Sequence, residues 1–345
     1  MLELKLISKR LGAMDMTGVS MRLERGEYFA LLGPTGVGKT VLIEIIAGLI
    51  RPDAGGVFWD GVDITSDPPE NRGFAVVYQD YALFPHLSVE KNIAYGAKSA
   101  RADTAEISAR TARLADMLGI TELLPRKPDT LSGGQQQRTA IARALATEPK
   151  LLLLDEPLSA LDTNTRTRLR GELKRINAEL GTTILHITHE PEEAMALADR
   201  IGVMLDYRLR QIAEPEELFR RPSDAEVAKF LGIRNVLTVS SVQDDICEVS
   251  GQRIRASAAT ESTRHIWIMP EELLLSDQPF TSSALNQFKC TVIDWDHSDA
   301  LLAVQLACGD LRLVALITYT SFQQLKIEPD RELYVTFKSS AIHCL

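Results

Sequence analysis

Apolar runs divide the first two thirds of the chain into short strands and longer helices. Short runs rich in apolar residues predict the strands of a buried sheet at residues 28–32, 74–78, 151–154 and 183–188. Residues 41–49 are apolar on almost every side, which predicts a buried helix. Helical spacing also runs from about residue 89 to 146 and from residue 163 to 180, where Gly181 ends the helix. Strands that alternate with helices in this way predict an α/β fold.

The start of the chain shows the alternation of apolar and polar residues that is typical of half-buried strands. Residues 1–32 alternate through two or three strands with breaks at Gly12 and Gly26, which predicts a small antiparallel sheet ahead of the buried one. Residues 56–64 have the pattern of a strand hairpin.

The pattern changes again near residue 233. Pro215 begins a short helix that is predicted to run to about Leu231. From Asn235 onward, short alternating strands predict a small all-β barrel, and the clearest lie at residues 288–292, 301–306, 311–317 and 333–337. The change predicts two domains, at residues 1–233 and 234–345.

Composition and charge narrow the class of protein. The 345 residues carry a formal net charge of -9 at pH 7, which argues against nucleic acid as a partner and against direct attraction to an anionic membrane surface. No apolar run approaches the roughly 18 residues of a membrane-spanning helix, and the first residues alternate like a strand rather than resembling a signal peptide. The sequence therefore predicts a cytoplasmic protein, and if this protein works at a membrane, another protein must hold it there.

The cysteines all lie in the last third of the chain, at Cys247, Cys290, Cys308 and Cys344. They show no C-x-x-C spacing, and the protein is predicted to remain unexported. This combination predicts buried free thiols.

The strongest chemical signal stands between the strand at 28–32 and the helix at 41–49. It has the pattern Gly-x-x-x-x-Gly-Lys-Thr, and its residues are Gly33, Pro34, Thr35, Gly36, Val37, Gly38, Lys39 and Thr40. Glycines let backbone N–H groups converge on an anion, and the helix N-terminus adds its dipole. Lys39 is expected to reach the β- and γ-phosphates, and the Thr40 hydroxyl to take one Mg²⁺ position. A tight turn with an incidental lysine is the alternative, but the flanking strand and helix favour a nucleotide site.

Polar side chains follow three of the predicted strands. Asp155 and Glu156 end the strand of leucines, at the edge where open α/β sheets bind ligands. Asp155 is expected to hold Mg²⁺ through water, and Glu156 to act as general base on the attacking water. Gln79 can ligate Mg²⁺ or hold that water. His189 can hydrogen-bond the γ-phosphate or the water, whereas His186 is predicted to be a core residue.

A second glycine-rich turn precedes a predicted helix. It contains Ser132 as a natural N-cap, followed by Gly133, Gly134 and Gln135, and it exposes backbone N–H groups toward an anion. Near Leu11, where nucleotide proteins often place an aromatic ring under the base, the chain has none. The base must therefore be held by aliphatic groups or from elsewhere.

Taken together, these motifs resemble in order and spacing the full set of an ABC transporter ATPase, over about residues 1–233. The resemblance implies a P-loop domain with a RecA-like core, an antiparallel β-subdomain and a helical subdomain at about residues 89–146. It implies ATP and Mg²⁺ as cofactors, and a head-to-tail homodimer in which residues 132–135 of one subunit close over ATP on the other. The apolar loop around Phe84 resembles the groove that receives a membrane permease. The ATPase would then be peripheral, at the cytoplasmic face of the inner membrane.

The last domain resembles the OB-like molybdate-binding module called the Mop or TOBE domain. In such a module hydroxyl groups, backbone N–H groups and one lysine surround a tetrahedral dianion. The candidate oxyanion residues are Ser282, Ser283, Asn286, Thr318, Ser321, Lys338, Ser339 and Ser340. The chain departs from the pattern at Leu285 and Met269, where relatives commonly have arginine.

The whole resemblance is closest to the molybdate or tungstate importers. It implies an ATPase subunit that works with a permease, is fed indirectly by an oxyanion-binding protein outside the membrane, and has molybdate or tungstate as a regulatory ligand that inhibits transport. Other interpretations are an importer for sulfate, a polyamine or a sugar whose barrel only dimerises, and a molybdate store or sensor with a vestigial ATPase. A soluble ABC ATPase of DNA repair or translation is disfavoured by the acidity of the chain and by the barrel.

Overall fold

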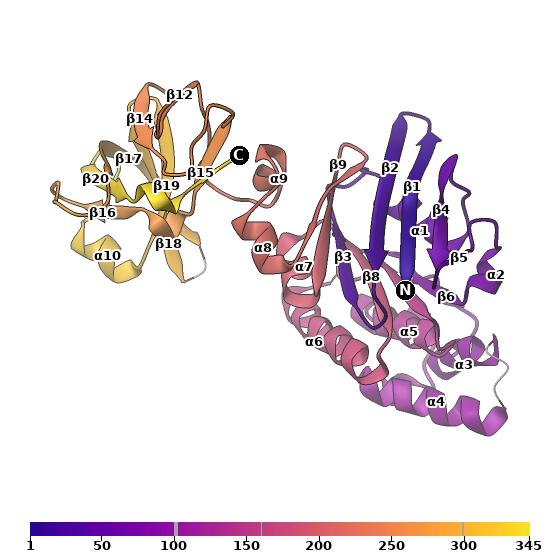
Figure 1. The fold of residues 1–345 in the computed structure, drawn as a ribbon. Helices are drawn as coiled ribbons and strands as arrows, with labels where there is room; N and C mark the ends of the chain where they lie inside the picture. Colours follow the sequence, from indigo (N-terminus) through magenta and orange to yellow (C-terminus); the bar gives the residue numbers. More distant parts are fainter. Residues whose placement is uncertain (100–102, 160, 299) are drawn as a thin grey trace. The chain divides into compact units, whose positions relative to one another are not determined.

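The computed structural model describes residues 1–99, 103–159, 161–298 and 300–345 (Figure 1). They form two compact units, Met1–Leu218 and Phe219–Leu345. Residues 100–102, inside the predicted helical region, and Ala160, in the turn before residue 163, lie outside the described residues. In the described part, no helix is both long and apolar enough to cross a membrane. The domain division at residue 233 stays a prediction.

A six-stranded sheet forms the centre of the first unit (Figure 1). Its order is β10-β9-β3-β8-β7-β6, and all neighbouring strands are parallel except β9 and β10. The strands are β3 Tyr28–Leu32, β6 Phe74–Val77, β7 Leu151–Asp155, β8 Thr183–Thr188, β9 Arg200–Leu205 and β10 Arg208–Ala213. In β7, Leu152 and Leu154 join one apolar core, while Leu151 and Leu153 join another. Both faces of the sheet are therefore buried, as continuous apolar runs predict.

Helices cover both faces of this sheet, which confirms the α/β prediction (Figure 1). Helix α1, Lys39–Ala47, shares the core of Leu151 and Leu153. The other core is shared with α3 Val89–Ser99, α4 Thr104–Met117, α5 Gly133–Leu145 and α6 Thr163–Leu180. Gly181 ends α6 in the left-handed conformation with φ +60°, as predicted. The short helices α2 Pro69–Arg72 and α7 Pro191–Leu197 complete this part.

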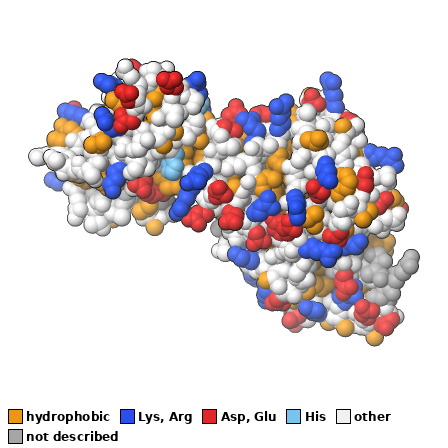
Figure 2. Space-filling model, viewed as in Figure 1, with side chains coloured by type: hydrophobic (Ala, Val, Ile, Leu, Met, Phe, Trp, Pro, Cys, Tyr) orange, Lys and Arg blue, Asp and Glu red, His pale blue; other side chains and the backbone are white. Residues whose placement is uncertain are grey.

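A smaller antiparallel sheet has the order β2-β1-β4-β5. Its strands are β1 Leu2–Leu11, β2 Met14–Leu23, β4 Ala54–Trp59 and β5 Val62–Asp63. Strands β1 and β2 form a hairpin that turns at Gly12, as the sequence predicts. On the face shown in Figure 2, positive and negative side chains are interspersed over the surface of the first unit.

The predicted helix from Pro215 to Leu231 is wrong in one respect, because two helices occupy this stretch. They are α8, Pro215–Arg220, and α9, Ala225–Phe230. Pro222 lies between them and has no N–H for a helical hydrogen bond. Asp224 then begins a new helix, since its side chain accepts hydrogen bonds from the N–H groups of Glu226 and Val227.

The second unit packs antiparallel sheets around a single apolar core, which confirms the all-β prediction for residues 235–345. The largest sheet has the order β16-β20-β17-β18-β19. Its strands are β16 Leu274–Ser276, β17 Asn286–Ser298, β18 Leu301–Cys308, β19 Leu311–Ile317 and β20 Glu332–Phe337, and the short helix α10 spans Tyr319–Gln324. Two smaller sheets contain β11 Val236–Thr238, β15 His265–Ile268 and β21 Ile342–Cys344, and β12 Ser241–Gln243, β13 Ile246–Val249 and β14 Gln252–Arg255.

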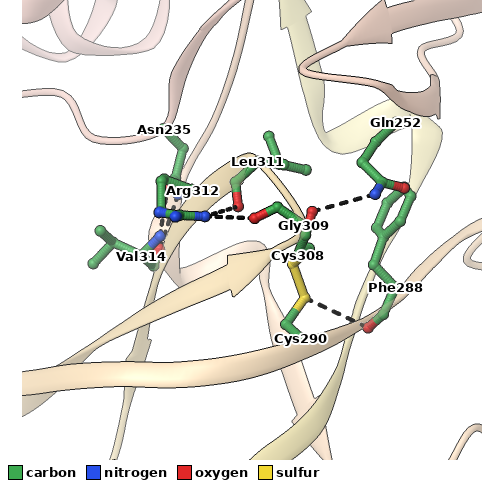
Figure 3. Close-up of a disulfide and its surroundings, with 9 residues drawn as sticks. All are labelled: Asn235, Gln252, Phe288, Cys290, Cys308, Gly309, Leu311, Arg312 and Val314. Atoms are coloured by element: carbon green, nitrogen blue, oxygen red, sulfur yellow. Dashed lines mark hydrogen bonds between the residues drawn. A yellow bond between two sulfur atoms is a disulfide. The ribbon is translucent and has the colours of Figure 1, made fainter. Parts of the chain in front are cut away.

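The prediction of four free thiols is wrong for Cys290 and Cys308, which form a disulfide (Figure 3). Strands β17 and β18 pair with Thr291 opposite Ala307, so the next pair along the ladder is Cys290 with Cys308. Their Cα atoms are 4.2 Å apart. Both side chains lie in the core of the unit. Cys247 is free and buried, as predicted, and Cys344 is free and half-buried.

The disulfide should make the stability of the second unit depend on reductant, because unfolding of the unit exposes the bond to reduction. The bond joins residues 18 positions apart, so its removal should lower the free energy of unfolding by about 2–4 kcal/mol through the greater freedom of the unfolded chain. Urea unfolding, followed by the fluorescence of Trp267 and Trp295, should shift to lower urea in the presence of a reductant. The double variant Cys290→Ala/Cys308→Ala should unfold at low urea with or without reductant, whereas Cys247→Ala should keep the shift. Wild-type unfolding curves with the same urea midpoint in the presence and absence of reductant would contradict the prediction.

Candidate functional site

The loop between β3 and α1 requires glycine at several positions. A Cβ atom at Gly33 would lie 2.4 Å from the carbonyl oxygen of Met204, which is closer than atoms can approach. Gly36 and Gly38 have φ of +83° and +93°, which L side chains rarely adopt. The loop therefore passes close to β9 and turns directly into α1, whose N-cap is Gly38. Backbone N–H groups of the loop and of the helix start are left to bind an anion.

Lys39 is held inside this loop. Its side chain is 4% exposed, and Nζ donates hydrogen bonds to the carbonyl oxygens of Gly33, at 2.7 Å, and Pro34, at 2.9 Å. Burial lowers the pKa of Lys39, and the nearby carboxylates Glu156 and Asp155 oppose this shift. The lysine is thus fixed beside the anion-binding N–H groups.

A cavity of about 420 Å³ joins the loop to the carboxyl end of β7. Its lining comes from the loop and α1, from the stretch after β6, from the end of β7 and from the first residue of β2. The lining residues are Met14, Thr35, Gly36, Gly38, Lys39, Thr40, Val41, Gln79, Asp155 and Glu156. The structure therefore brings together the predicted phosphate loop, Gln79 and both carboxylates. Met14, which follows Leu11 in the stretch where the sequence has no aromatic ring, also lines the cavity.

The donor set at the end of β7 suits Mg²⁺. Burial raises the pKa of Asp155, while a hydrogen bond from Thr40 lowers it. A buried carboxylate of this kind is stabilised in its ionised form by a cation. The hydroxyl of Thr40, the amide oxygen of Gln79 and the carboxylate of Asp155 are all oxygen ligands, and Mg²⁺ usually takes one or two carboxylates together with substrate phosphates. The residues present fit the metal.

His189 contacts Glu156 but is not itself among the residues that line the cavity. The His189 Nδ1 atom lies 3.2 Å from Oε1 of Glu156. Glu156 has a φ of +46°, and its N–H donates to the carbonyl oxygen of Ile187 at 3.0 Å. The hydroxyl of Ser159 donates to the backbone oxygen of Glu156 at 2.9 Å and accepts from Gln79 Nε2 at 3.4 Å. Ser159 thus links two predicted site residues, a contact that local spacing did not reveal.

The second carboxylate beside His189 has different partners. Glu190 Oε2 lies 3.0 Å from Arg166 and 3.7 Å from Arg170, both on α6. Two guanidinium groups therefore face Glu190, whereas Glu156 faces the cavity. Arg166 and Arg170 lie 24 and 20 positions before Glu190 along the chain, so no local sequence pattern pointed to these contacts.

The comparisons with known proteins agree with this geometry. Residues 16–159 match the ABC transporter family, and residues 282–344 match the TOBE domain. The molybdate/tungstate import ATP-binding protein WtpC of Pyrococcus abyssi is 46% identical to this chain over 342 residues, which cover 99% of both proteins. The chain belongs to the ABC transporter ATPases. It is therefore an ATP-binding subunit that hydrolyses ATP in a transporter.

Two further relatives support the same family. The WtpC protein of Thermococcus kodakarensis is 49% identical over 83% of this chain and 86% of its own. A solved dimeric ATP-binding cassette in a post-hydrolysis state, bound to ADP and Pi, is 29% identical, with a TM-score of 0.55 over 62% of this chain and 99% of that one. ABC ATPases of this kind dimerise and, in importers, pair with a permease.

The second glycine-rich turn of the ABC ATPase lies apart from the cavity lining within the chain. Ser132 caps α5, because its Oγ accepts a hydrogen bond from the N–H of Gln135 at 3.4 Å and Gln135 Oε1 accepts from the N–H of Ser132 at 3.0 Å. Gly133 leads into the helix, and Gly134 is buried against Thr165. The cap is preformed, with its exposed face on Ser132 and Gly133.

The predicted permease groove of the ABC ATPase is partly exposed. Phe84 packs against Tyr95 with ring centroids 4.7 Å apart, and Tyr95 is 55% exposed. Arg143 lies 5.1 Å from the Phe84 ring and donates to the carbonyl oxygens of Tyr81 and Ala82. An arginine from α5 thus fixes the loop that carries Phe84.

The predicted oxyanion residues fall into two groups. Asn286 pairs with Phe337 across β17 and β20, so residues 282–285 enter the sheet at the same end at which residues 338–340 leave it. Thr318 and Ser321 lie at the far end of β19, beside the part of β18 that starts at Leu301. They form the cap of α10, where the Thr318 hydroxyl accepts from the N–H of Ser321 at 3.2 Å.

The buried side chain of Asn286 hydrogen-bonds to the backbone of Arg255, which is a structural role. It is 2% exposed, and its side chain accepts from the N–H of Arg255 at 2.7 Å and donates to the Arg255 carbonyl at 2.9 Å. Ser339 receives a hydrogen bond from Ser257 at 2.8 Å. Ser282, Ser283, Lys338 and Ser340 are exposed, and Leu285 beside them is 62% exposed.

Proposed function

We propose that this chain is the ATP-hydrolysing subunit of an importer for molybdate or tungstate. The proposal is carried by the similarity to a molybdate/tungstate import ATP-binding protein at 46% identity over 99% of both chains, since this extent includes the second unit as well as the ATPase. The cavity supports an active enzyme rather than a vestigial one, because Lys39, Asp155 and Glu156 all line it.

Within the ATPase, residues 33–40 bind the phosphates of ATP through backbone N–H groups and Lys39. Thr40, Gln79 and Asp155 would hold Mg²⁺, which would supply positive charge to neutralise the phosphates of ATP. Glu156 takes the proton of the attacking water as general base. His189 hydrogen-bonds the γ-phosphate or that water from its place 3.2 Å from Glu156.

The active form is a head-to-tail homodimer. In one subunit the phosphate loop leaves the γ-phosphate side open, and a second helix N-terminus would close it against water. Ser132, Gly133, Gly134 and Gln135 of the partner supply this helix start, and the cap on α5 is already formed. The dimer binds a permease through the groove around Phe84, and it lies peripherally at the cytoplasmic face of the inner membrane. An oxyanion-binding protein outside delivers the substrate to the permease.

The second unit binds the transported oxyanion and thereby inhibits transport. The exposed hydroxyls of Ser282, Ser283 and Ser340 and the charge of Lys338 belong to the segments that enter β17 and leave β20 at the end where Asn286 pairs with Phe337. Thr318 and Ser321 contribute to an oxyanion site only from another copy or after rearrangement, because they lie at the other end of the sheet. Leu285 replaces one cationic contact that relatives commonly have.

Calorimetric titration of the full-length chain tests the substrate. Molybdate and tungstate should bind, and sulfate should bind far more weakly. Lys338→Ala should weaken molybdate binding by about 10-fold or more, since a hydrogen bond to a charged group contributes about 1.5–3 kcal/mol. Lys289→Ala, which removes another exposed lysine of the unit, serves as the control.

Each other outcome has a distinct meaning. Equal binding of sulfate would favour a sulfate importer. If no anion bound, the proposed sensing role of the second unit would be wrong. The ATPase assignment would be unaffected, because it is tested separately by the kinetics of ATP hydrolysis.

A further inference from the structure

A chain of buried polar groups lies behind His189, outside the cavity. It contains Tyr28 at the start of β3, His186 and Thr188 on β8, and Glu193 on α7. All four are at most 2% exposed. Burying polar groups and a carboxylate this deeply is costly unless they are paired, so their arrangement needs an explanation.

His186 lies between Tyr28 and Glu193 and contacts each of them through a different ring nitrogen. The Tyr28 hydroxyl lies 2.8 Å from His186 Nδ1, and His186 Nε2 lies 2.8 Å from Glu193 Oε1. Burial first and then the charge of Glu193 hold the pKa of Tyr28 well above its usual value, so the phenol keeps its proton and its O–H donates a hydrogen bond to Nδ1. With Nδ1 accepting, Nε2 carries the ring proton and faces the carboxylate.

The other oxygen of Glu193 leads back to the candidate site. Thr188 donates its hydroxyl hydrogen to Glu193 Oε2 at 3.1 Å, and the same hydroxyl oxygen accepts from the backbone N–H of Glu190 at 3.0 Å. Burial alone would raise the pKa of Glu193, but His186 and the hydrogen bonds lower it overall, so the carboxylate stays ionised as an acceptor. Thr188 and Glu190 are the residues on either side of His189.

We propose that Tyr28, His186, Glu193 and Thr188 are positioning residues, which hold the backbone on both sides of His189 and so aim its ring at Glu156 and ATP. The proposal rests on the proposed role of His189. It also connects β3, which leads into the phosphate loop, with β8, which leads into His189, because Tyr28 and Ile184 pair in the parallel ladder. Through these groups the two segments keep one relative position.

Substitutions at Thr188 test the proposal in the full-length ATPase. Thr188→Val keeps the shape of the side chain but removes both hydrogen bonds, and it should lower kcat about 10-fold, with KM for ATP changed less than about twofold. Thr188→Ser should restore most of kcat. Thr183→Val is the matched control, since Thr183 is buried at the other end of β8 and its hydroxyl accepts from the N–H of Gly26 at 3.0 Å. It should change thermal stability but not kcat. Equal losses of kcat in both valine variants would overturn the proposal.

A double-variant cycle separates this proposal from the proposed function. If His189→Ala leaves kcat unchanged, the assigned role of His189 is wrong. If His189→Ala lowers kcat, the variant His189→Ala/Thr188→Val decides the inference. Action through His189 predicts the kcat of His189→Ala alone, whereas a loss equal to the product of the two single effects would refute the positioning role.

Discussion

Replacing Glu156 by glutamine is expected to lower kcat for ATP hydrolysis by a factor of about 10² to 10⁴, the usual contribution of a general base. The amide keeps the size of the side chain but cannot take a proton from water. Phosphate binding by residues 33–40 does not depend on this proton transfer, so the affinity for ATP should be retained. Steady-state kcat at saturating ATP, together with calorimetric binding of ATP, provides the measurement.

The backbone explains why the glutamine variant should keep its position. The left-handed conformation of Glu156, with φ +46°, costs of the order of 1–3 kcal/mol in a residue other than glycine. It is held by the bond from its N–H to the oxygen of Ile187 and by the N–H and hydroxyl of Ser159, which donate to its carbonyl oxygen. None of these bonds uses the carboxylate, so the substitution changes the chemistry and not the turn.

Glu190 offers the matched control. It lies next to His189, but Arg166 and Arg170 face its carboxylate. Glu190→Gln should therefore change kcat by no more than about twofold, as is usual for a partly exposed side chain outside the reacting groups. Equal losses in the two glutamine variants would show that the general base is misassigned.

Strand β7 shows why most of the fold could be predicted from the sequence. Its leucines are consecutive, so this short stretch of sequence is enough to predict a strand that is buried on both faces of a parallel sheet. The disulfide could not be predicted in this way. Cys290 and Cys308 become neighbours only through the register of β17 and β18, and that register is set by two strands and the turn between them. The break between α8 and α9 differs from the disulfide, because Pro222 lies in this stretch and cannot donate a helical hydrogen bond, so a local signal for the break is present in the sequence.

The same distinction holds within the candidate site. Lys39, Asp155 and Glu156 lie in stretches whose local geometry fixes where the side chains point, and the structure places all three on one cavity. The groups that hold the site residues come from other elements. Ser159 and Glu193 act through contacts that only the tertiary structure creates. In the second unit, a run of hydroxyl residues predicts hydrogen bonding but does not distinguish an anion site from a helix cap such as Thr318.

Lys39→Ala is expected to weaken ATP binding by about 10- to 100-fold and to lower kcat as well. The ammonium group is buried and already fixed at 2.7 and 2.9 Å from the carbonyl oxygens of Gly33 and Pro34. It can therefore meet the phosphates without ordering a flexible side chain, and its contact is made in the bound ground state as well as in the transition state. Glu156→Gln, in contrast, removes an interaction of the transition state alone.

Calorimetric titration with ATP in the presence of a chelator, which prevents turnover, directly measures the contribution of Lys39 to ATP binding in the ground state. Lys174→Ala is the control, because Lys174 is an exposed lysine on α6 and should leave the affinity unchanged. If Lys39→Ala bound ATP as tightly as the wild type and only kcat fell, the lysine would act on the transition state alone. The loop N–H groups would then account for ground-state binding by themselves, and the fixed position of Lys39 would serve to aim a charge at the γ-phosphate during transfer.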